Sequence, residues 1–276
     1  MGSTGLRFIK AHGTENDFVL LPEGQGELDA ATVRRLCDRR AGIGADGVLR
    51  VVREDGGFFM DYRNADGSVA ETCGNGLRVF ARYLVDAGLL PPGRIRIGTR
   101  SGVRLVDVPA DGGDITAELG PAAPLTDATV LLGGRSWPAA GWSMGNPHLV
   151  VLDAGDIDAL DLATAPGVDP AAAYPDGVNV EFCQPLSGRR LALRVVERGV
   201  GETRSCGTGA GAAAVAALAA AGARGDYDVR VPGGELRVRW DDDGDVWLTG
   251  PAVLVAEGQV DADVLAAWRN QPEHRG

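Results

Sequence analysis

The sequence predicts an α/β (α+β) protein of two pseudo-symmetric domains, each a mixed, mainly antiparallel sheet rolled around a central helix. Two short runs, at residues 72–76 and 205–209, each place a cysteine before a Gly-x-Gly that opens an alanine- and leucine-rich helical stretch. The cysteines, Cys73 and Cys206, stand 133 residues apart (206 − 73), close to half of the 276-residue chain. Alternating apolar runs precede both cysteines, and the second helical stretch is apolar all round, which is typical of a helix enclosed by its sheet.

Further residues recur at matching offsets before the two cysteines. The pairs are Asn64 and Glu197 at nine residues, Asp46 and Asn179 at 27, and Asn16 and Asn146 at 57 and 60. With the cysteines themselves this makes four matches in one order, which indicates an internal repeat of a whole domain. We therefore expect an N-terminal half at 1–119 that carries Cys73, and a C-terminal half at 120–255 that carries Cys206. The C-terminal segment 256–276, with a helical run at 260–270, is expected to pack on the first half.

Periodicity gives the same order of elements in both halves. The first half predicts strands near 6–10, 17–21, 47–53 and 57–63, a helix from 75 to about 87, and strands near 94–98, 103–108 and 114–119. The second half predicts strands near 148–153, 178–184 and 191–197, a helix from 208 to about 221, and strands near 228–231, 235–240, 245–249 and 253–257. A helix-like run at 31–40 and a turn at 64–67 add to the first half, and the Pro- and Gly-rich stretch 120–124 is the best linker candidate.

Composition limits the partners. A net charge of −11 and a pI near 4.8 argue against nucleic acid and anionic membranes, because either would need a basic face. No basic-then-apolar leader precedes the first predicted strand, and the longest apolar stretch, 210–221, is too short to span a bilayer. We expect a cytoplasmic protein that binds a small molecule, and a homodimer is left open.

Four cysteines in a chain of this length are too few for a disulfide scaffold, and none forms a C-x-x-C pair. Cys37 lies in the helix-like run and Cys183 in a strand-like run, both without a glycine-rich sequel. A cysteine in such a place is usually a small buried hydrophobic residue. These two are therefore expected to be packing residues.

Cys73 and Cys206 are in a different position, just before the first turn of a helix. The first N–H groups of a helix have no internal partner and carry partial positive charge, so that end binds anions and stabilises a thiolate. The glycines that follow each cysteine allow a ligand carboxylate to approach the same N–H groups. A buried thiol in a tight strand-to-helix turn would explain one copy, but it explains two matched copies poorly.

Two thiols that face one carbon atom from opposite sides predict an inversion of configuration. A thiolate removes a proton from a stereocentre and a thiol returns one to the opposite face, while the helix N-termini stabilise the charge that develops on the adjacent carboxylate. Pyridoxal phosphate would need a Schiff-base lysine, and Lys10 is the single lysine of the chain. A mechanism without cofactor or metal is favoured.

Seven motifs in order carry a family resemblance that extends over nearly the whole chain. They are GTENDF (13–18), RNADGS (63–68), TCGNG (72–76), MGNPH (144–148), GVNV (177–180), ERG (197–199) and SCGTG (205–209). The sequence resembles the diaminopimelate epimerases. The resemblance implies two similar α/β domains with the ligand between them, and interconversion of LL- and meso-2,6-diaminopimelate on the route to lysine and peptidoglycan, without metal or cofactor.

The same resemblance implies roles for individual residues. Cys73 and Cys206 would be the acid/base pair. The residues implied on the substrate are the backbone N–H groups of Gly74, Asn75, Gly207 and Thr208, and the side chains of Asn16, Asn64, Asn146, Asn179, Glu197 and Arg198. Arg198 would hold the distal carboxylate and Glu197 would meet an ammonium group. His148 resembles a supporting histidine near the reacting amino group, although taken alone it would be a structural histidine.

Three positions depart from the family pattern, and two alternative functions stay open. Glu15 stands where glycine is common, Gly47 where some members have a glutamine that contacts substrate, and Gly211 where a further cysteine is common. The first alternative is a related cofactor-independent amino-acid racemase with another substrate. The second is a thiol redox or binding protein, which would leave the asparagine set and the pair Glu197 and Arg198 unexplained.

Overall fold

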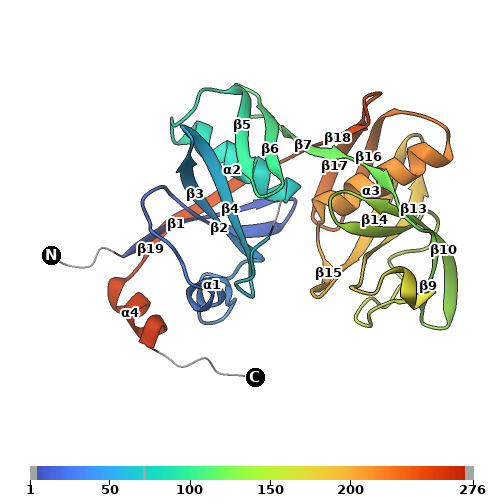
Figure 1. The fold of residues 1–276 in the computed structure, drawn as a ribbon, viewed down its shortest axis with the longest axis horizontal. Coiled ribbons are helices and arrows are strands. Elements are labelled where there is room, and N and C mark those ends of the chain that lie inside the picture. Colours follow the sequence, from blue (N-terminus) through green and yellow to red (C-terminus); the bar gives the residue numbers. More distant parts are fainter. Residues whose placement is uncertain (1–4, 71–72, 271–276) are drawn as a thin grey trace. The chain divides into compact units, whose positions relative to one another are not determined.

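The computed structural model describes residues 5–70 and 73–270, and its contacts divide the chain into two compact units. Unit 1 comprises Met1–Gly13, Asp17–Ile115 and Ala252–Gly276, and unit 2 comprises Thr14–Asn16 and Thr116–Pro251. Each unit has one long helix among its strands, α2 (Gly74–Asp86) in unit 1 and α3 (Gly207–Ala220) in unit 2 (Figure 1). Thr72, part of one sequence motif, lies outside the described residues.

Unit 1 is a sheet folded around α2. Its other elements are β1 (Leu6–Gly13), β2 (Asn16–Leu21), α1 (Ala30–Cys37), β3 (Gly47–Glu54), β4 (Gly57–Asn64), β5 (Gly93–Thr99), β6 (Gly102–Val108), β19 (Val253–Val260) and α4 (Ala262–Asn270). The strands pair in the order β19–β1–β2–β3–β4–β5–β6, with β2–β3 and β4–β5 parallel. Helix α2 contacts both ends of this order, β19 and β6, which shows that the sheet curves around it.

Unit 2 repeats the arrangement around α3. Its strands are β7 (Ile115–Pro121), β8 (Ala123–Pro124), β9 (Ala128–Leu132), β10 (Arg135–Ser143), β11 (Pro147–Val151), β12 (Gly167–Asp169), β13 (Asn179–Leu186), β14 (Arg190–Glu197), β15 (Gly201–Thr203), β16 (Gly225–Val231), β17 (Gly234–Trp240) and β18 (Asp245–Gly250), with a 3-10 turn at Ala171–Ala173. The main order is β8–β10–β11–β13–β14–β16–β17–β18–β7, with β11–β13 and β14–β16 parallel. The pseudo-symmetric α/β fold is therefore confirmed.

Strand register supports the repeat but moves one predicted match by a residue: Asn179 corresponds to Gly47 rather than to Asp46. In unit 1 the parallel pair β2–β3 sets Phe18 opposite Gly47, and in unit 2 the parallel pair β11–β13 sets His148 opposite Asn179. Because Phe18 and His148 each follow the motif asparagine of their own half by two residues, the two registers correspond. A position in one half can therefore be compared with its counterpart in the other.

Apolar clusters among the described residues support these sheets. Helix α3 is buried with Val229, Val238 and Leu248 of the surrounding strands. On the other face of the unit 2 sheet, Trp137 and Phe182 pack edge to face, with ring centroids 5.7 Å apart. In unit 1 the outer face of the sheet is covered by α1, and α4 packs on α1. None of the helices in residues 5–70 and 73–270 is both long and apolar enough to cross a membrane.

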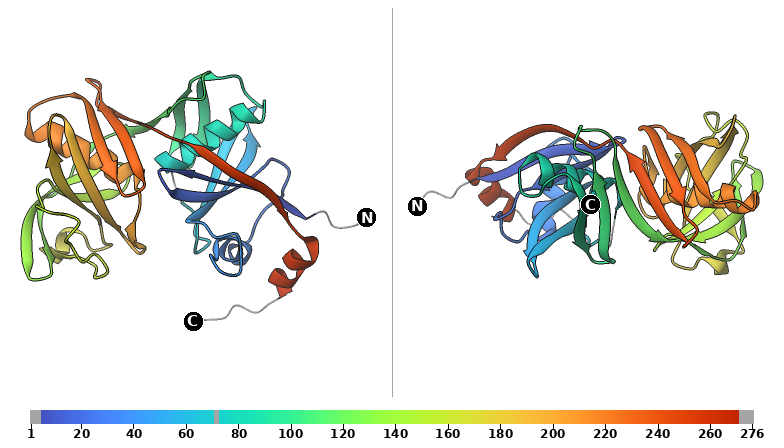
Figure 2. Two further views of the ribbon diagram at one scale, coloured as in Figure 1. Left: turned by 180° about the vertical axis from the view of Figure 1, so that it is seen from behind. Right: turned by 90° about the horizontal axis from the view of Figure 1, so that it is seen from above.

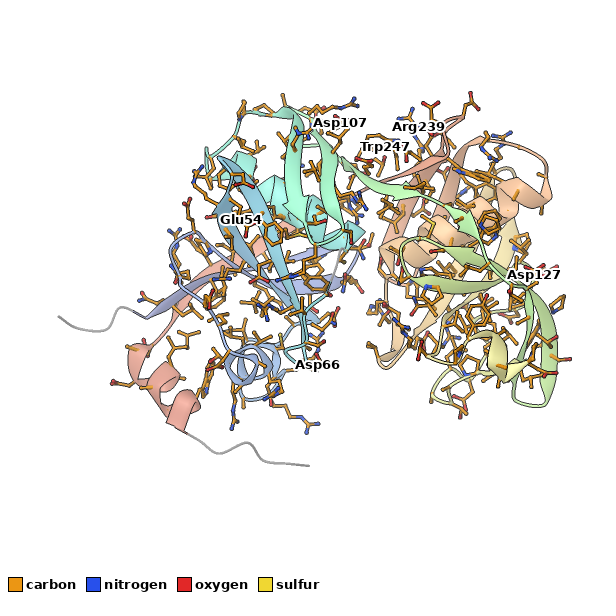
Figure 3. The ribbon with its side chains drawn as sticks, viewed as in Figure 1. Glu54, Asp66, Asp107, Asp127, Arg239 and Trp247 are labelled. Carbon is orange, nitrogen blue, oxygen red and sulfur yellow. The ribbon has the colours of Figure 1, made fainter. Side chains whose placement is uncertain are left out.

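The C-terminal segment belongs to unit 1 through β19, which pairs antiparallel with β1 before α4 begins. Figure 2 shows β19, in red, running along β1, in blue. The strand is longer than the 253–257 predicted, and the helical run is shorter at its start. Asp66, in the turn after β4, accepts a bond from the Ser68 N–H at 2.8 Å, as expected of a turn residue (Figure 3).

Unit 2 contains strands that periodicity missed. The hairpin β9–β10 turns through Gly133 and Gly134, which have φ values of 57° and 76° as a two-residue type I′ turn requires. The stretch 120–124, our linker candidate, instead lies in β7 and β8, where Ala123 and Pro124 pair with β10. The contacts also place residues 14–16 and 116–119 in unit 2, whereas the sequence analysis placed them in the N-terminal half.

Candidate active site

Cys73 is the N-cap residue of α2, as the sequence predicted. Its backbone is extended, with φ −136° and ψ 118°, and its sulfur accepts a hydrogen bond from the Gly76 N–H at 3.4 Å. The side chain is half-buried. The thiol therefore lies at the end of the helix where partial positive charge favours an anion.

Cys206 occupies the same position at the start of α3. Its φ of −115° and ψ of 116° match those of Cys73, and its sulfur accepts from the Gly209 N–H at 3.4 Å. It is more buried, with 7% of its surface exposed. The two cysteine positions, called half-sites below, thus share one backbone arrangement, a cysteine N-cap followed by Gly-x-Gly.

A buried cation lies close behind Cys73. Arg78 is fully buried in α2 and donates from Nη2 to the Asn75 side-chain oxygen at 3.0 Å. Burial lowers the pKa of Arg78 to about 10, while negative charge on Cys73 and Asp114 acts to raise it. The Asn75 side chain is thus engaged with Arg78, which leaves its backbone N–H as the group that the sequence analysis assigned to a ligand.

Packing in unit 1 explains why this chain has Gly47 where some family members have a glutamine. A Cβ atom on Gly47 would lie 2.5 Å from the Arg63 carbonyl oxygen and 2.7 Å from the Tyr62 ring. No glutamine fits there while Tyr62 keeps its place. Nearby, Asn64 ends β4 and donates from Nδ2 to Ser68 Oγ at 3.0 Å.

Glu197 lies beside the Cys206 thiol in unit 2 and accepts a hydrogen bond from Thr203. Burial raises the pKa of Glu197, although hydrogen bonds from Thr203 Oγ1 and from the Cys206 side chain favour its carboxylate. Burial likewise raises the pKa of Cys206 well above its usual value, and negative charge on Glu197 adds to this. Burial and the neighbouring carboxylate therefore favour the protonated form of the Cys206 thiol.

His148 is fully buried and bonded at both ring nitrogens. Its Nδ1 lies 2.7 Å from Glu181 Oε1, and its Nε2 lies 3.0 Å from Asn146 Oδ1. Glu181 is also fully buried. These bonds fix the plane of the imidazole beside the cysteine half-site.

The Arg198 side chain is exposed, and the backbone of this residue is fixed by a hydrogen bond. Its backbone N–H donates to Asn179 Oδ1 at 2.9 Å, and its guanidinium donates to the Asp176 carbonyl at a longer distance, 3.4 Å. Within the described residues Arg198 forms no ion pair with a carboxylate. A guanidinium held in this way can receive the carboxylate of a ligand.

The first sequence motif contributes to unit 2 as well. Thr14 Oγ1 and Ser205 Oγ lie 2.6 Å apart, and Glu15 pairs with Arg204. Thr14 and Glu15 have positive φ values of 50° and 61°, so the segment is a strained turn held by its partners. Glu15, the second departure, is thus part of an ion pair with Arg204, two residues before Cys206 in the chain, and Asn16 follows it in the same segment.

The third departure, Gly211, is tightly packed in α3. A Cβ atom there would lie 3.0 Å from Leu119 Cδ1 and 3.1 Å from Met144 Cε. A cysteine would require both side chains to move. The other two cysteines are buried as expected, and burial raises the pKa of Cys37 to about 12.

Sequence reasoning missed three polar residues that the structure places at the half-sites: Arg78, Glu181 and Thr203. Arg78 and Glu181 are charged residues within the predicted helix and strand runs, but Arg82 lies in the same helix and the sequence shows no partner for either residue. Thr203 lies in the three-residue strand β15 and gave no signal. Lys10 has a structural role, since it bonds to Asp17 and to the Gly44 carbonyl.

Comparison with known proteins identifies the family of the chain. The family model described as diaminopimelate epimerase matches residues 8–124 and 142–255. A diaminopimelate epimerase of Streptomyces coelicolor is 50% identical, covering 96% of this chain and 98% of that protein, and one of Thermobifida fusca is 49% identical, covering 94% and 100%.

Solved structures show the same fold at low identity. A hydroxyproline epimerase from Agrobacterium vitis, with bound trans-4-hydroxy-L-proline, has a TM-score of 0.72 at 15% identity, covering 95% of this chain and 94% of that one. That likeness concerns the fold alone. The sequence match is what assigns the protein: this chain belongs to the diaminopimelate epimerase family.

Proposed function

We propose that this protein interconverts LL- and meso-2,6-diaminopimelate without metal or cofactor, with Cys73 and Cys206 as the acid/base pair. One observation carries the proposal: two cysteines cap two equivalent helices with the same backbone geometry. The names of the relatives support the substrate. The reaction lies on the route to lysine and peptidoglycan.

The proton transfers balance in both directions. The thiolate takes the α-proton and becomes a thiol, while the electron pair of the broken C–H bond remains on Cα and is delocalised into the adjacent carboxylate. The second thiol then gives its proton to the opposite face and becomes a thiolate. Each turnover therefore inverts the stereocentre and exchanges the protonation states of the two sulfurs.

The helix N-termini stabilise the intermediate of this reaction. We assign the N–H groups of Gly74 and Asn75, and of Gly207 and Thr208, to the carboxylate on which negative charge develops. Helix-terminal N–H groups are oriented in advance, so they stabilise that charge without reorganisation. Polarisation of the carboxylate is the main requirement of a mechanism that has no cofactor.

The distal end of the substrate gives specificity. We assign its carboxylate to Arg198 and its ammonium to Glu197 and to the oxygens of the asparagine side chains. Asn16, Asn64, Asn146 and Asn179 complete this set, with His148 in support. The absence of an internal carboxylate partner for Arg198 among the described residues supports the assignment.

The proposal is tested by following deuterium at Cα in D2O. With LL-diaminopimelate, we expect the meso product to carry one deuterium at the inverted centre, while substrate recovered early in the reaction carries none. L-proline and L-histidine, which have no distal carboxylate, should exchange very slowly. Rapid exchange of L-proline would instead support the alternative, a racemase with another substrate.

Cellular setting follows from the chemistry of the thiols. The mechanism needs both sulfurs reduced, which supports the cytoplasm as the compartment. The negative net charge of −11 supports a small-molecule partner and gives no basis for nucleic acid. A homodimer stays a proposal that sedimentation of the purified protein can decide.

A further inference from the structure

Glu181 is a buried carboxylate that the proposed chemistry has not yet used. It lies on β13 and shares a strand face with Asn179 and Cys183, because side chains alternate along a strand. Cys183 belongs to the apolar cluster around α3, so this face is directed toward the helix. Glu181 therefore lies beneath the helix that Cys206 caps.

The carboxylate is only partly satisfied. Oε1 is bonded to His148 Nδ1 at 2.7 Å, whereas Oε2 is buried and has no hydrogen-bond partner among the described residues. A buried carboxylate oxygen without a partner destabilises the folded protein. Such a group requires a functional explanation.

Gly209 shows how close this carboxylate lies to the thiol. A Cβ atom on Gly209 would lie 2.8 Å from Glu181 Oε1, 3.3 Å from Cys206 Cβ and 3.4 Å from Cys206 Sγ. The acid and the thiol thus flank the same glycine in the first turn of α3. Glycine at this position makes room for Glu181 as well as for a ligand.

The equivalent positions in unit 1 are apolar. By strand register Leu49 corresponds to Glu181, and Phe18 corresponds to His148. Gly76, the counterpart of Gly209, would bring a Cβ atom 3.3 Å from Leu49 Cδ2 and 3.6 Å from Phe18 Cζ. A phenylalanine–leucine pair therefore supports one cysteine cap, and a histidine–glutamate pair supports the other.

We propose that Glu181 is a positioning residue of the Cys206 half-site, where it fixes the His148 imidazole and holds a carboxyl group against the glycine turn that Cys206 caps. The inference rests on the proposed function, since it gives Cys206 the role of proton donor in the resting enzyme. It adds a residue for which the sequence motifs gave no role.

The groups that face Cys206 come from three elements. They are Glu181 on β13, Glu197 on β14 and Thr208 on α3, with His148 on β11 bonded to Glu181. Burial raises the pKa of the Cys206 thiol first of all, Glu197 and Glu181 raise it further, and the hydrogen bond with Thr208 lowers it. Removal of the charge on Glu181 should therefore shift the titration of Cys206 toward lower pH.

Three variants distinguish the effect of the Glu181 charge from the effect of its hydrogen bond to His148. Glu181→Gln keeps an oxygen for His148 Nδ1 and removes the charge. Glu181→Leu removes both, and combined with His148→Phe it copies the pair found in unit 1. Glu235→Gln is the matched control, since Glu235 is an exposed carboxylate of unit 2 paired with Arg190.

Two readouts are measured on each purified variant after its thermal melting curve has confirmed folding. The first is kcat and KM for LL-diaminopimelate. The second is the pH midpoint for modification of Cys206 by methyl methanethiosulfonate, followed by mass spectrometry of the Cys206 peptide. A residue that serves only the fold would not move the second.

We expect Glu181→Gln to lower the modification midpoint of Cys206 by about one pH unit and kcat by about 10-fold. Glu181→Leu should lower kcat by about 100-fold with a smaller change in KM, because the imidazole loses its fixed position. The double variant should lower kcat no further than Glu181→Leu alone, because both changes remove the same hydrogen bond between Glu181 and His148. Glu235→Gln should match the unmodified protein in both readouts.

An unchanged midpoint and kcat in folded Glu181→Gln and Glu181→Leu would overturn the inference. Cys206→Ser distinguishes that outcome from failure of the proposed function. If Cys206→Ser abolishes epimerisation while both Glu181 variants are normal, the two-thiol mechanism stands and the role of Glu181 is wrong. If Cys206→Ser stays active, the proposed function itself is wrong.

Discussion

The two cysteine caps have nearly the same backbone and different surroundings. Each sulfur accepts the N–H of the residue three positions on, at 3.4 Å. Around Cys73 the groups identified are a buried cation, Arg78, and an apolar pair, whereas around Cys206 they are the carboxylates Glu197 and Glu181. The two helix caps thus correspond in backbone, and the different residues packed against them are the basis of our proposal that Cys73 is the resting base and Cys206 the resting acid.

The largest expected effect comes from breaking either member of the pair. Cys73→Ser and Cys206→Ser should each lower kcat for diaminopimelate by about 1,000-fold or more, because a hydroxyl cannot replace a thiol that must gain and lose a proton near neutral pH. Each variant should still eliminate from a halogenated analogue that needs a single proton transfer. Wild-type epimerisation by either variant would rule out two equivalent roles.

Arg198 sharpens the comparison, because unit 1 offers Ala65 at the corresponding position and has no matching guanidinium. Arg198→Ala should lower kcat/KM by about 30-fold or more through loss of a charge-assisted pair, and lysine should not restore it, since it lacks the planar fork. We expect kcat to fall as well as affinity, because distal binding energy helps to orient the reacting centre. Unchanged kcat/KM would remove the basis for specificity toward a dicarboxylate.

Two matched glycines test the difference in packing directly. Gly209→Ala would push a Cβ atom against the Glu181 carboxylate, which His148 holds in place, so we expect a loss of about 2 kcal/mol in the free energy of unfolding. Gly76→Ala meets only side-chain carbons at 3.3 Å and beyond, and should change stability by less than about 1 kcal/mol. Denaturant unfolding measures both, and equal losses would contradict the packing described.

A smaller effect is expected at low pH from a cluster present in unit 1 only. Burial opposes ionisation of Asp17, but hydrogen bonds from Arg39 and Lys10 hold its pKa at about 2. Because the folded pKa lies below the unfolded value, this stabilisation is present above about pH 4 and is lost as the pH falls toward 2. The matching position in unit 2 is Pro147, which cannot titrate.

Asp17→Asn tests that contribution. The variant should lose about 1–2 kcal/mol of unfolding free energy near neutral pH and should differ less from the unmodified protein at pH 2–3. A difference that stayed constant with pH would show that the ion pairs of Asp17 do not account for its effect.

Much of this fold could be predicted from the sequence, because the repeat is visible in rare residues at fixed offsets. The helices capped by Cys73 and Cys206 and most sheet strands have clear periodicity. The hairpin β9–β10 was missed although its Gly133-Gly134 turn is a known hairpin signal, since short flanking strands with Pro138 weakened the pattern. Residues 14–16 belong to unit 2 because of tertiary contacts, and no local sequence pattern predicts such contacts.

The candidate site was predictable where chemistry and sequence spacing coincide. Cysteines before Gly-x-Gly point to helix caps, and the structure places them there. Glu181 was not predicted, because a single glutamate in a strand shows its importance only when its neighbours in space are known. The steric reasons for Gly47 and Gly209 likewise depend on side chains from other strands.

The most direct test compares modification of the two thiols in the ligand-free protein across a range of pH. Peptide mass spectrometry after brief treatment with methyl methanethiosulfonate would follow Cys73 and Cys206 in one sample. We predict that Cys73 is modified at lower pH than Cys206, because carboxylates surround the second thiol and a guanidinium lies near the first. Modification of Cys206 at equal or lower pH would contradict the assignment of a resting acid and a resting base.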